Sequence, residues 1–151
     1  MKHIDTNALV VLILGIIDPR LIGTHRRTSI YDESDYFDLI AAIGGLEKLV
    51  VLPNVWTETD NLLNGTIPNR QFEYVQVLKQ VVSKTTEEFL SSKHAVESEV
   101  FYHLGITDTL LLNYAPKCDL LITSDSMLSD HARSRGIRVF DIVANKNARL
   151  S

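Results

Sequence analysis

Short apolar segments alternate with longer amphipathic segments along the whole chain. Apolar runs of about four residues that end at polar or turn residues are typical of strands buried on both faces of a sheet. The segments predicted as strands are 2–5, 49–52, 120–123 and 137–142. Because helical segments separate them, the pattern predicts an α/β fold in which a parallel β-sheet is flanked by helices on both faces.

The segments between these strands repeat their apolar residues at the period of a helix. Residues 6–17 are apolar all round, which predicts a helix that is buried on most sides. Asn54 is expected to cap one helix, and Pro68 to open a long one. The apolar positions of that long helix include Phe72 and Phe89. The other predicted helices are 32–45, 95–104, 107–114 with Thr107 as its cap, and 126–134.

Length and composition restrict the class of protein. The 151 residues fit a single domain, 1–151, and 45% of them are hydrophobic, which excludes a disordered chain. The net charge of −4 argues against a protein that coats nucleic acid with positive charge. One cysteine, Cys118, allows neither an intrachain disulfide nor a cysteine zinc site. The apolar run 8–17 is too short to span a bilayer and lacks a cleavage site, so we expect a cytoplasmic protein without a membrane segment.

Acidic residues follow the predicted strands at their carboxyl ends. Asp5 and Asp125 come directly after apolar strand residues. Glu58 lies on a helix that begins just after a strand, and Asp108 lies in the first turn of another helix. Because the carboxyl ends of parallel strands meet at one edge of the sheet, we expect these four side chains to gather there.

Each acid has a structural explanation of its own, as a helix cap or as a favourable charge in a first turn. Four acids at one edge of the sheet need a different explanation. Carboxylates gathered within a few Å repel one another and all stay ionised only beside a compensating cation. Carboxylate oxygens suit hard ions such as Mg²⁺ or Mn²⁺, so the sequence predicts a site for one of these metals.

In this order and context the acids resemble those of the PIN-domain ribonucleases, small metal-dependent nucleases that include toxins of many bacterial toxin–antitoxin pairs. The resemblance covers nearly the whole chain and implies a PIN-like three-layer fold. The stretch Leu14–Ser34 matches no catalytic motif and leaves the substrate open. The matching segments are Asp5-Thr6-Asn7, Glu58 after Leu52-Pro53, Thr107-Asp108, and Thr123-Ser124-Asp125.

The resemblance also implies a reaction and roles for single residues. The implied chemistry is hydrolysis of RNA phosphodiester bonds by water that one or two Mg²⁺ or Mn²⁺ ions activate. Thr123 would support a metal or its water. Asn7 would contact the metal-binding acids without binding the metal itself. Arg26 and Arg27, in the segment 18–31 that we predict to be an exposed loop, are candidates for contacts with RNA phosphates. The implied catalytic and metal-binding acids are Asp5, Glu58, Asp108 and Asp125.

The implied partners are RNA, a second copy of the chain and, for a toxin, an antitoxin that places an Arg or Lys among the acids. Aromatic residues are enriched at interfaces, although helical spacing favours the core for Phe72. The aromatic residues considered are Trp56, Phe72, Tyr74 and Phe101.

Three other functions remain open on the sequence. One is a PIN nuclease of RNA processing or defence, and another is a catalytically silent PIN-like interaction module. The third, a haloacid-dehalogenase-type phosphatase, needs a second Asp two positions after the first. Asn7 occupies that position.

Overall fold

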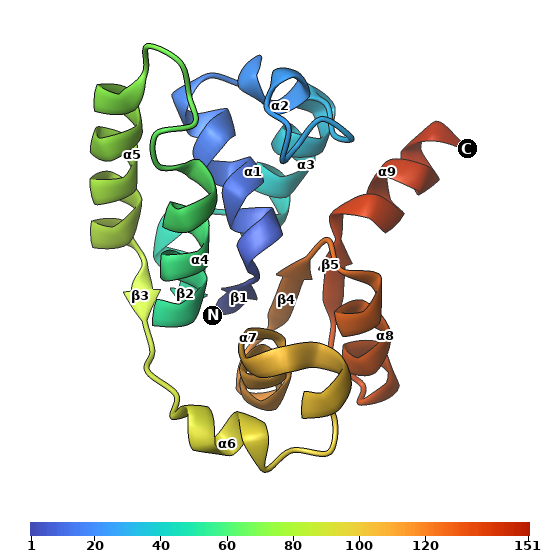
Figure 1. Cartoon of the computed structure of the whole chain (residues 1–151). Helices are drawn as coiled ribbons and strands as arrows, with labels where there is room; N and C mark the ends of the chain where they lie inside the picture. Colours follow the sequence, from blue (N-terminus) through green and yellow to red (C-terminus); the bar gives the residue numbers. More distant parts are fainter.

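The computed structural model describes residues 1–151 and contains one parallel sheet of five strands. Its order is β3-β2-β1-β4-β5, so the chain reverses direction across the sheet between β1 and β4 (Figure 1). The α/β class with a parallel sheet is confirmed. The strands are β1 (Lys2–Ile4), β2 (Leu49–Val51), β3 (Thr86–Glu87), β4 (Leu120–Thr123) and β5 (Val139–Asp141).

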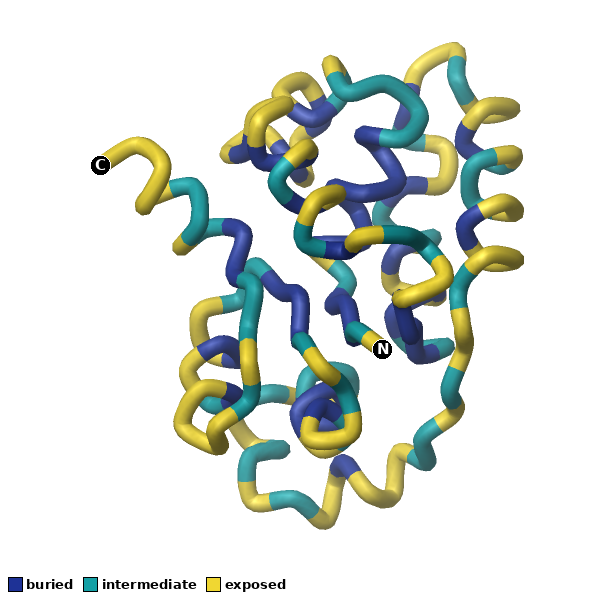
Figure 2. Tube along the Cα trace, turned by 180° about the vertical axis from the view of Figure 1, so that it is seen from behind, coloured by how far each residue is buried: buried dark blue, intermediate teal, exposed yellow.

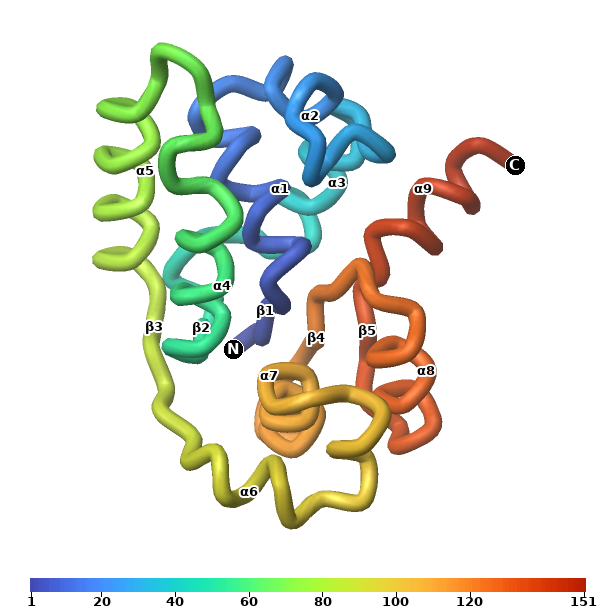
Figure 3. Tube along the Cα trace, in the orientation of Figure 1, coloured from blue at the N-terminus to red at the C-terminus, as the bar shows by residue number.

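The helices form two groups, one on each face of the sheet (Figures 1 and 3). Helix α1 packs against α2, α3, α4 and α5, whereas α7 packs against α6 and α8. The helices are α1 (Thr6–Ile17), α2 (Leu21–Thr24), α3 (Glu33–Ile43), α4 (Pro53–Leu63), α5 (Gln71–Lys84), α6 (Ser92–Val96), α7 (Phe101–Tyr114), α8 (Ser126–Ser134) and α9 (Ile142–Leu150), with short 3₁₀ turns at Leu46–Lys48 and Ala115–Lys117.

Helix α1 forms the centre of the core, as its sequence predicts. Residues 8–15 are all buried, and Figure 2 shows this stretch as one continuous buried segment. Burial on every side explains why the helix is apolar all round rather than on one stripe. The helix therefore positions Asp5, the residue that precedes it, from the middle of the molecule.

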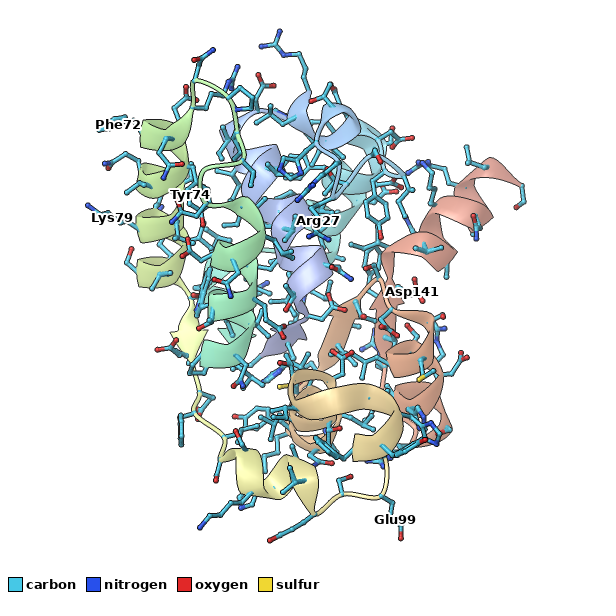
Figure 4. The ribbon with its side chains drawn as sticks, viewed as in Figure 1. Arg27, Phe72, Tyr74, Lys79, Glu99 and Asp141 are labelled. Carbon is cyan, nitrogen blue, oxygen red and sulfur yellow. The ribbon has the colours of Figure 1, made fainter.

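Helix α5 turns a different face to the core from the one predicted. Tyr74 and Val81 are fully buried, whereas Phe72 is 76% exposed. Figure 4 shows Phe72 on the outer side of α5 and Tyr74 on the side of α4, where its hydroxyl donates to Asp60 at 2.6 Å. The expectation that Phe72 belongs to the core is therefore wrong, and Phe89 lies beyond the end of the helix. Trp56 is buried, and Phe101 is half-buried.

Several helix boundaries also differ from the prediction. Leu52, not Asn54, precedes α4, and Pro53 takes its first position, where a missing N–H costs nothing. The predicted helix 95–104 is divided between α6 and the first turn of α7. Thr107 follows a kink at Gly105, but its hydroxyl donates to Glu58 at 3.0 Å and does not cap the part of α7 that comes after the kink.

The C-terminal part contains a helix that the apolar pattern did not predict. The last strand ends at Asp141, and α9 follows directly. Ion pairs connect α9 to α3. Lys146 lies 3.0 Å from the buried carboxylate of Asp35, and Arg149 lies 3.0 Å from the partly exposed carboxylate of Asp38.

The segment 18–31 is only partly the exposed loop that was predicted. It contains α2, and the side chains of Ile22, His25 and Thr28 are buried. The His25 ring accepts the backbone N–H of Arg27 at 3.1 Å and lies 2.9 Å from the Thr66 hydroxyl. Arg26 and Arg27 are exposed.

None of the helices has the length and apolar character that crossing a membrane requires.

Substitution of Gly15 by Ala tests the tight contact between α1 and α3. A Cβ at Gly15 would overlap the Tyr36 ring, so Gly15→Ala should lower the free energy of unfolding by roughly 1–3 kcal/mol, measured by urea denaturation. Gly23→Ala in α2 is the matched control, because nothing lies within 4 Å of its Cβ position. Equal stability of the two variants would contradict this packing.

Candidate active site

All four predicted acids line one pocket of about 610 Å³ at the carboxyl edge of the sheet. They come from four places in the fold: the residue after β1, helix α4, helix α7 and the N-cap of α8, which follows β4. No Lys, Arg or His lines the pocket. Its lining residues are Asp5, Thr6, Asn7, Glu58, Asn61, Leu62, Leu104, Gly105, Ile106, Thr107, Asp108 and Asp125.

Asp5 is the most deeply buried of these acids, with 3% of its surface exposed. Its Oδ1 accepts the backbone N–H of Ala8 at 2.9 Å and so caps α1. Its Oδ2 accepts the hydroxyl of Thr123 and the backbone N–H of Ser124. One carboxylate therefore connects β1, α1 and the end of β4.

Asp125 repeats this arrangement one strand away. Its Oδ1 accepts the backbone N–H of Leu128 at 2.9 Å and caps α8. The Thr123 hydroxyl accepts the backbone N–H of Asp125 at 2.9 Å while it donates to Asp5. Thr123 thus fixes the two acids relative to each other.

Glu58 is held by hydroxyl groups from two other helices. The Thr6 hydroxyl of α1 donates to Oε1 at 2.6 Å, and the Thr107 hydroxyl of α7 donates to Oε2 at 3.0 Å. Because α1 and α7 lie on opposite faces of the sheet, the Glu58 carboxylate connects the two groups of helices at the pocket.

A break in α7 brings Asp108 to the pocket. Residues 104–108 are consecutive, and all of them line it. Successive residues of a regular helix turn by about 100°, so five in a row would circle the axis. Gly105 interrupts the helix with φ 76° and ψ −176°, a conformation that is essentially restricted to glycine.

Burial and mutual repulsion change the titration of two acids. Burial, together with the charges of Asp5, Asp125 and Glu58, raises the pKa of Asp108 to about 7. Burial also raises the pKa of Asp5 to about 6, with a smaller contribution from Asp125, although its hydrogen bonds act in the opposite direction. Ionisation of all four acids of the pocket at neutral pH is therefore unfavourable without a cation.

The other predicted site residues divide into two groups. Asn7 lines the pocket and is exposed. Arg26 and Arg27 do not line it, although Figure 4 draws Arg27 over α1, near the middle of the molecule. With the side chains as they stand, no three Asp, Glu, His or Cys residues converge closely enough to enclose one metal ion.

Sequence reasoning missed the roles of Thr6 and Thr107. Both threonines stand next to an acid in the chain, Thr6 after Asp5 and Thr107 before Asp108. The interpretation of such hydroxyls as helix caps hid their contacts with Glu58. Asp141 was also missed. This buried residue ends β5, caps α9 and accepts the Ser129 hydroxyl at 2.8 Å, but it does not line the pocket (Figure 4).

Comparison with known proteins does not assign this chain to a family. No protein family and no curated protein sequence matches the chain. One solved structure, a domain of a functionally unknown protein from Methanocaldococcus jannaschii DSM 2661, is similar to it over 93% of this chain and 89% of that one. The two share 13% sequence identity, with a TM-score of 0.46. Such a likeness carries no information about function.

The raised pKa of Asp108 predicts a pH-dependent gain in stability for Asp108→Asn in metal-free buffer. Between pH 3.8 and about 7, the folded protein retains a proton that the unfolded chain has released. The free energy of unfolding of the wild type therefore falls as the pH rises through this range. Asp108→Asn removes that loss and should exceed the wild type by on the order of 1–3 kcal/mol at pH 8, but not at pH 4.

Urea denaturation of both proteins in chelator, across this pH range, provides the measurement. Titrating groups far from Asp108 are common to the two proteins and cancel in the difference, which therefore reports Asp108 and the acids coupled to it. A difference that stays constant with pH would contradict the proposed environment of Asp108.

Proposed function

We propose that this protein is a metal-dependent ribonuclease of the PIN-domain type, which hydrolyses RNA phosphodiester bonds at the pocket of the four acids. One observation carries the proposal: four carboxylates from four separate elements line a pocket that contains no cationic side chain. Charges gathered in this way cost free energy in the absence of a cation, and a fold retains such a cost at functional sites.

The donor chemistry of the pocket fits a hard divalent cation. Asp5, Glu58, Asp108 and Asp125 would hold Mg²⁺ or Mn²⁺ through oxygen alone. No hydrogen bond from the protein contributes to the pKa of Asp108, so its oxygens are available as ligands. When bound, the metal lowers the pKa of a coordinated water and neutralises charge on the scissile phosphate.

The side chains of the protein would fix the position of the bound ligand. Thr123 and the caps of α1 and α8 fix Asp5 and Asp125, and so a ligand bound between these acids has a defined place on the sheet edge. Asn7 and Asn61 add neutral amides to the lining, which can hydrogen-bond a ribose or a base without attracting a further cation. RNA as the substrate rests on the sequence resemblance, as do the toxin role and the homodimer.

Cleavage should depend on divalent metal and on the acids of the pocket. With a fluorescent RNA oligonucleotide, chelator should abolish cleavage, and Mg²⁺ or Mn²⁺ should restore it. Asp108→Asn should lower kcat by at least about 100-fold, the scale on which the loss of one electrostatic group in an active site acts.

Asp130→Asn is the matched control, because Asp130 is exposed on α8 and lies outside the pocket. It should cleave as the wild type does. A DNA oligonucleotide of the same sequence tests whether the protein cleaves RNA in preference to DNA. Cleavage that persists in chelator, or in Asp108→Asn, would exclude the proposed mechanism.

A further inference from the structure

The geometry points to Thr6 and Thr107 as positioning residues that hold the Glu58 carboxylate ready to bind metal, and we call this arrangement the Glu58 clamp. The inference rests on the proposed function and deepens it. It assigns a role to two hydroxyl groups that are not themselves proposed as metal ligands.

The clamp is defined by two hydrogen bonds to opposite oxygens of one carboxylate. Thr6 donates to Oε1 at 2.6 Å, and Thr107 donates to Oε2 at 3.0 Å. The donors lie 52 and 49 residues from Glu58 in the chain, so neither contact follows from local geometry. Each oxygen keeps a second lone pair, because a carboxylate oxygen accepts in two directions.

Glu58 needs such support more than Asp5 and Asp125 do. Asp5 and Asp125 are short side chains that cap helices, so backbone N–H groups already fix them. Glu58 is exposed, and no backbone N–H donates to it. The last torsion of a glutamate is broad, and ordering a long side chain costs conformational entropy when it binds a ligand. Two hydroxyls that fix both oxygens remove that cost beforehand.

The backbone on both sides of the pocket is arranged for these contacts. Thr6 is the first residue of α1, directly after the capping Asp5. Thr107 lies two residues after the kink at Gly105, which lets it line the pocket together with Asp108. Each threonine thus presents its hydroxyl beside an acid of the site and contacts an acid from another element.

Mn²⁺ affinity tests the clamp without reference to catalysis. The dissociation constant is measured from the electron paramagnetic resonance signal of free Mn²⁺ during titration of the purified chain. Thr107→Val keeps the shape of the side chain but removes the donor, and should weaken Mn²⁺ binding about 10-fold or more, as loss of a partner that orients a metal ligand does. Thr6→Val should act in the same direction.

Two variants separate positioning from a general disturbance. Thr107→Ser retains the hydroxyl and should bind Mn²⁺ nearly as the wild type does. Thr57→Val makes the same change one residue from Glu58, on an exposed threonine that takes no part in the clamp, and should leave the affinity unchanged. Thermal unfolding in chelator confirms that each variant is folded.

A double-mutant cycle shows whether Thr107 acts through Glu58. In a Glu58→Gln background, Thr107→Val should cause little further loss of Mn²⁺ affinity, since the carboxylate that it orients is gone. If instead the double variant loses Mn²⁺ affinity by the product of the two single-variant factors, Thr107 contacts the metal or its water directly. That result would overturn the clamp.

Two further outcomes are decisive. If the wild type binds Mn²⁺ and both valine variants bind it equally well, the clamp is wrong while the proposed function stands. If the wild type binds no Mn²⁺ and cleaves no RNA, the proposed function falls and the clamp falls with it.

Discussion

The arrangement of this molecule depends on the burial of one carboxylate, that of Asp5, at the point where β1 becomes α1. Its oxygens accept from the backbone of α1 and from the residues that end β4, so the central strand, its neighbour and the core helix share one polar group. These bonds stabilise the ionised form, whereas burial and the charge of Asp125 oppose it. The site is therefore built into the centre of the fold and is not a feature added to its surface.

Much of the fold could be predicted from the sequence, because buried helices and strands have apolar residues in patterns that are visible over short segments. The run 6–17 and the strand 120–123 have the predicted bounds, and both are largely buried. Two of the elements that escaped prediction, β3 and α9, depend on other interactions. The two residues of β3 are polar and exposed, and pair with β2 through the backbone. Helix α9 depends on ion pairs such as that of Lys146 with Asp35, 111 residues apart in the chain.

The same distinction applies to the site. Asp5, Glu58 and Asp125 were predictable because each follows a strand directly or lies on the helix after one, and the topology of a parallel sheet brings these segments together. Asp108 was predictable because it closely follows the Gly105 at which the helix breaks. The contacts of Thr6 and Thr107 with Glu58 were not, since a hydroxyl beside an acid is equally suited to capping a helix. Nor does loop composition say where a side chain points, so the positions of Arg26 and Arg27 relative to the pocket could not be predicted.

The break at Gly105 divides α7 into a first turn with exposed side chains and a longer part that carries Asp108. Tyr102 and His103 are exposed on the solvent side of the break, whereas Asp108 and the buried Thr109 follow it. A helix that is interrupted does not transmit a change of side chain along its axis as a continuous one does. Changes in residues 101–104, of which Leu104 lines the pocket, therefore alter its wall on one side of the break, while Asp108 lies on the other side. For the ribonuclease proposed above, this separates the residues that would shape substrate choice from those that would hold the metal.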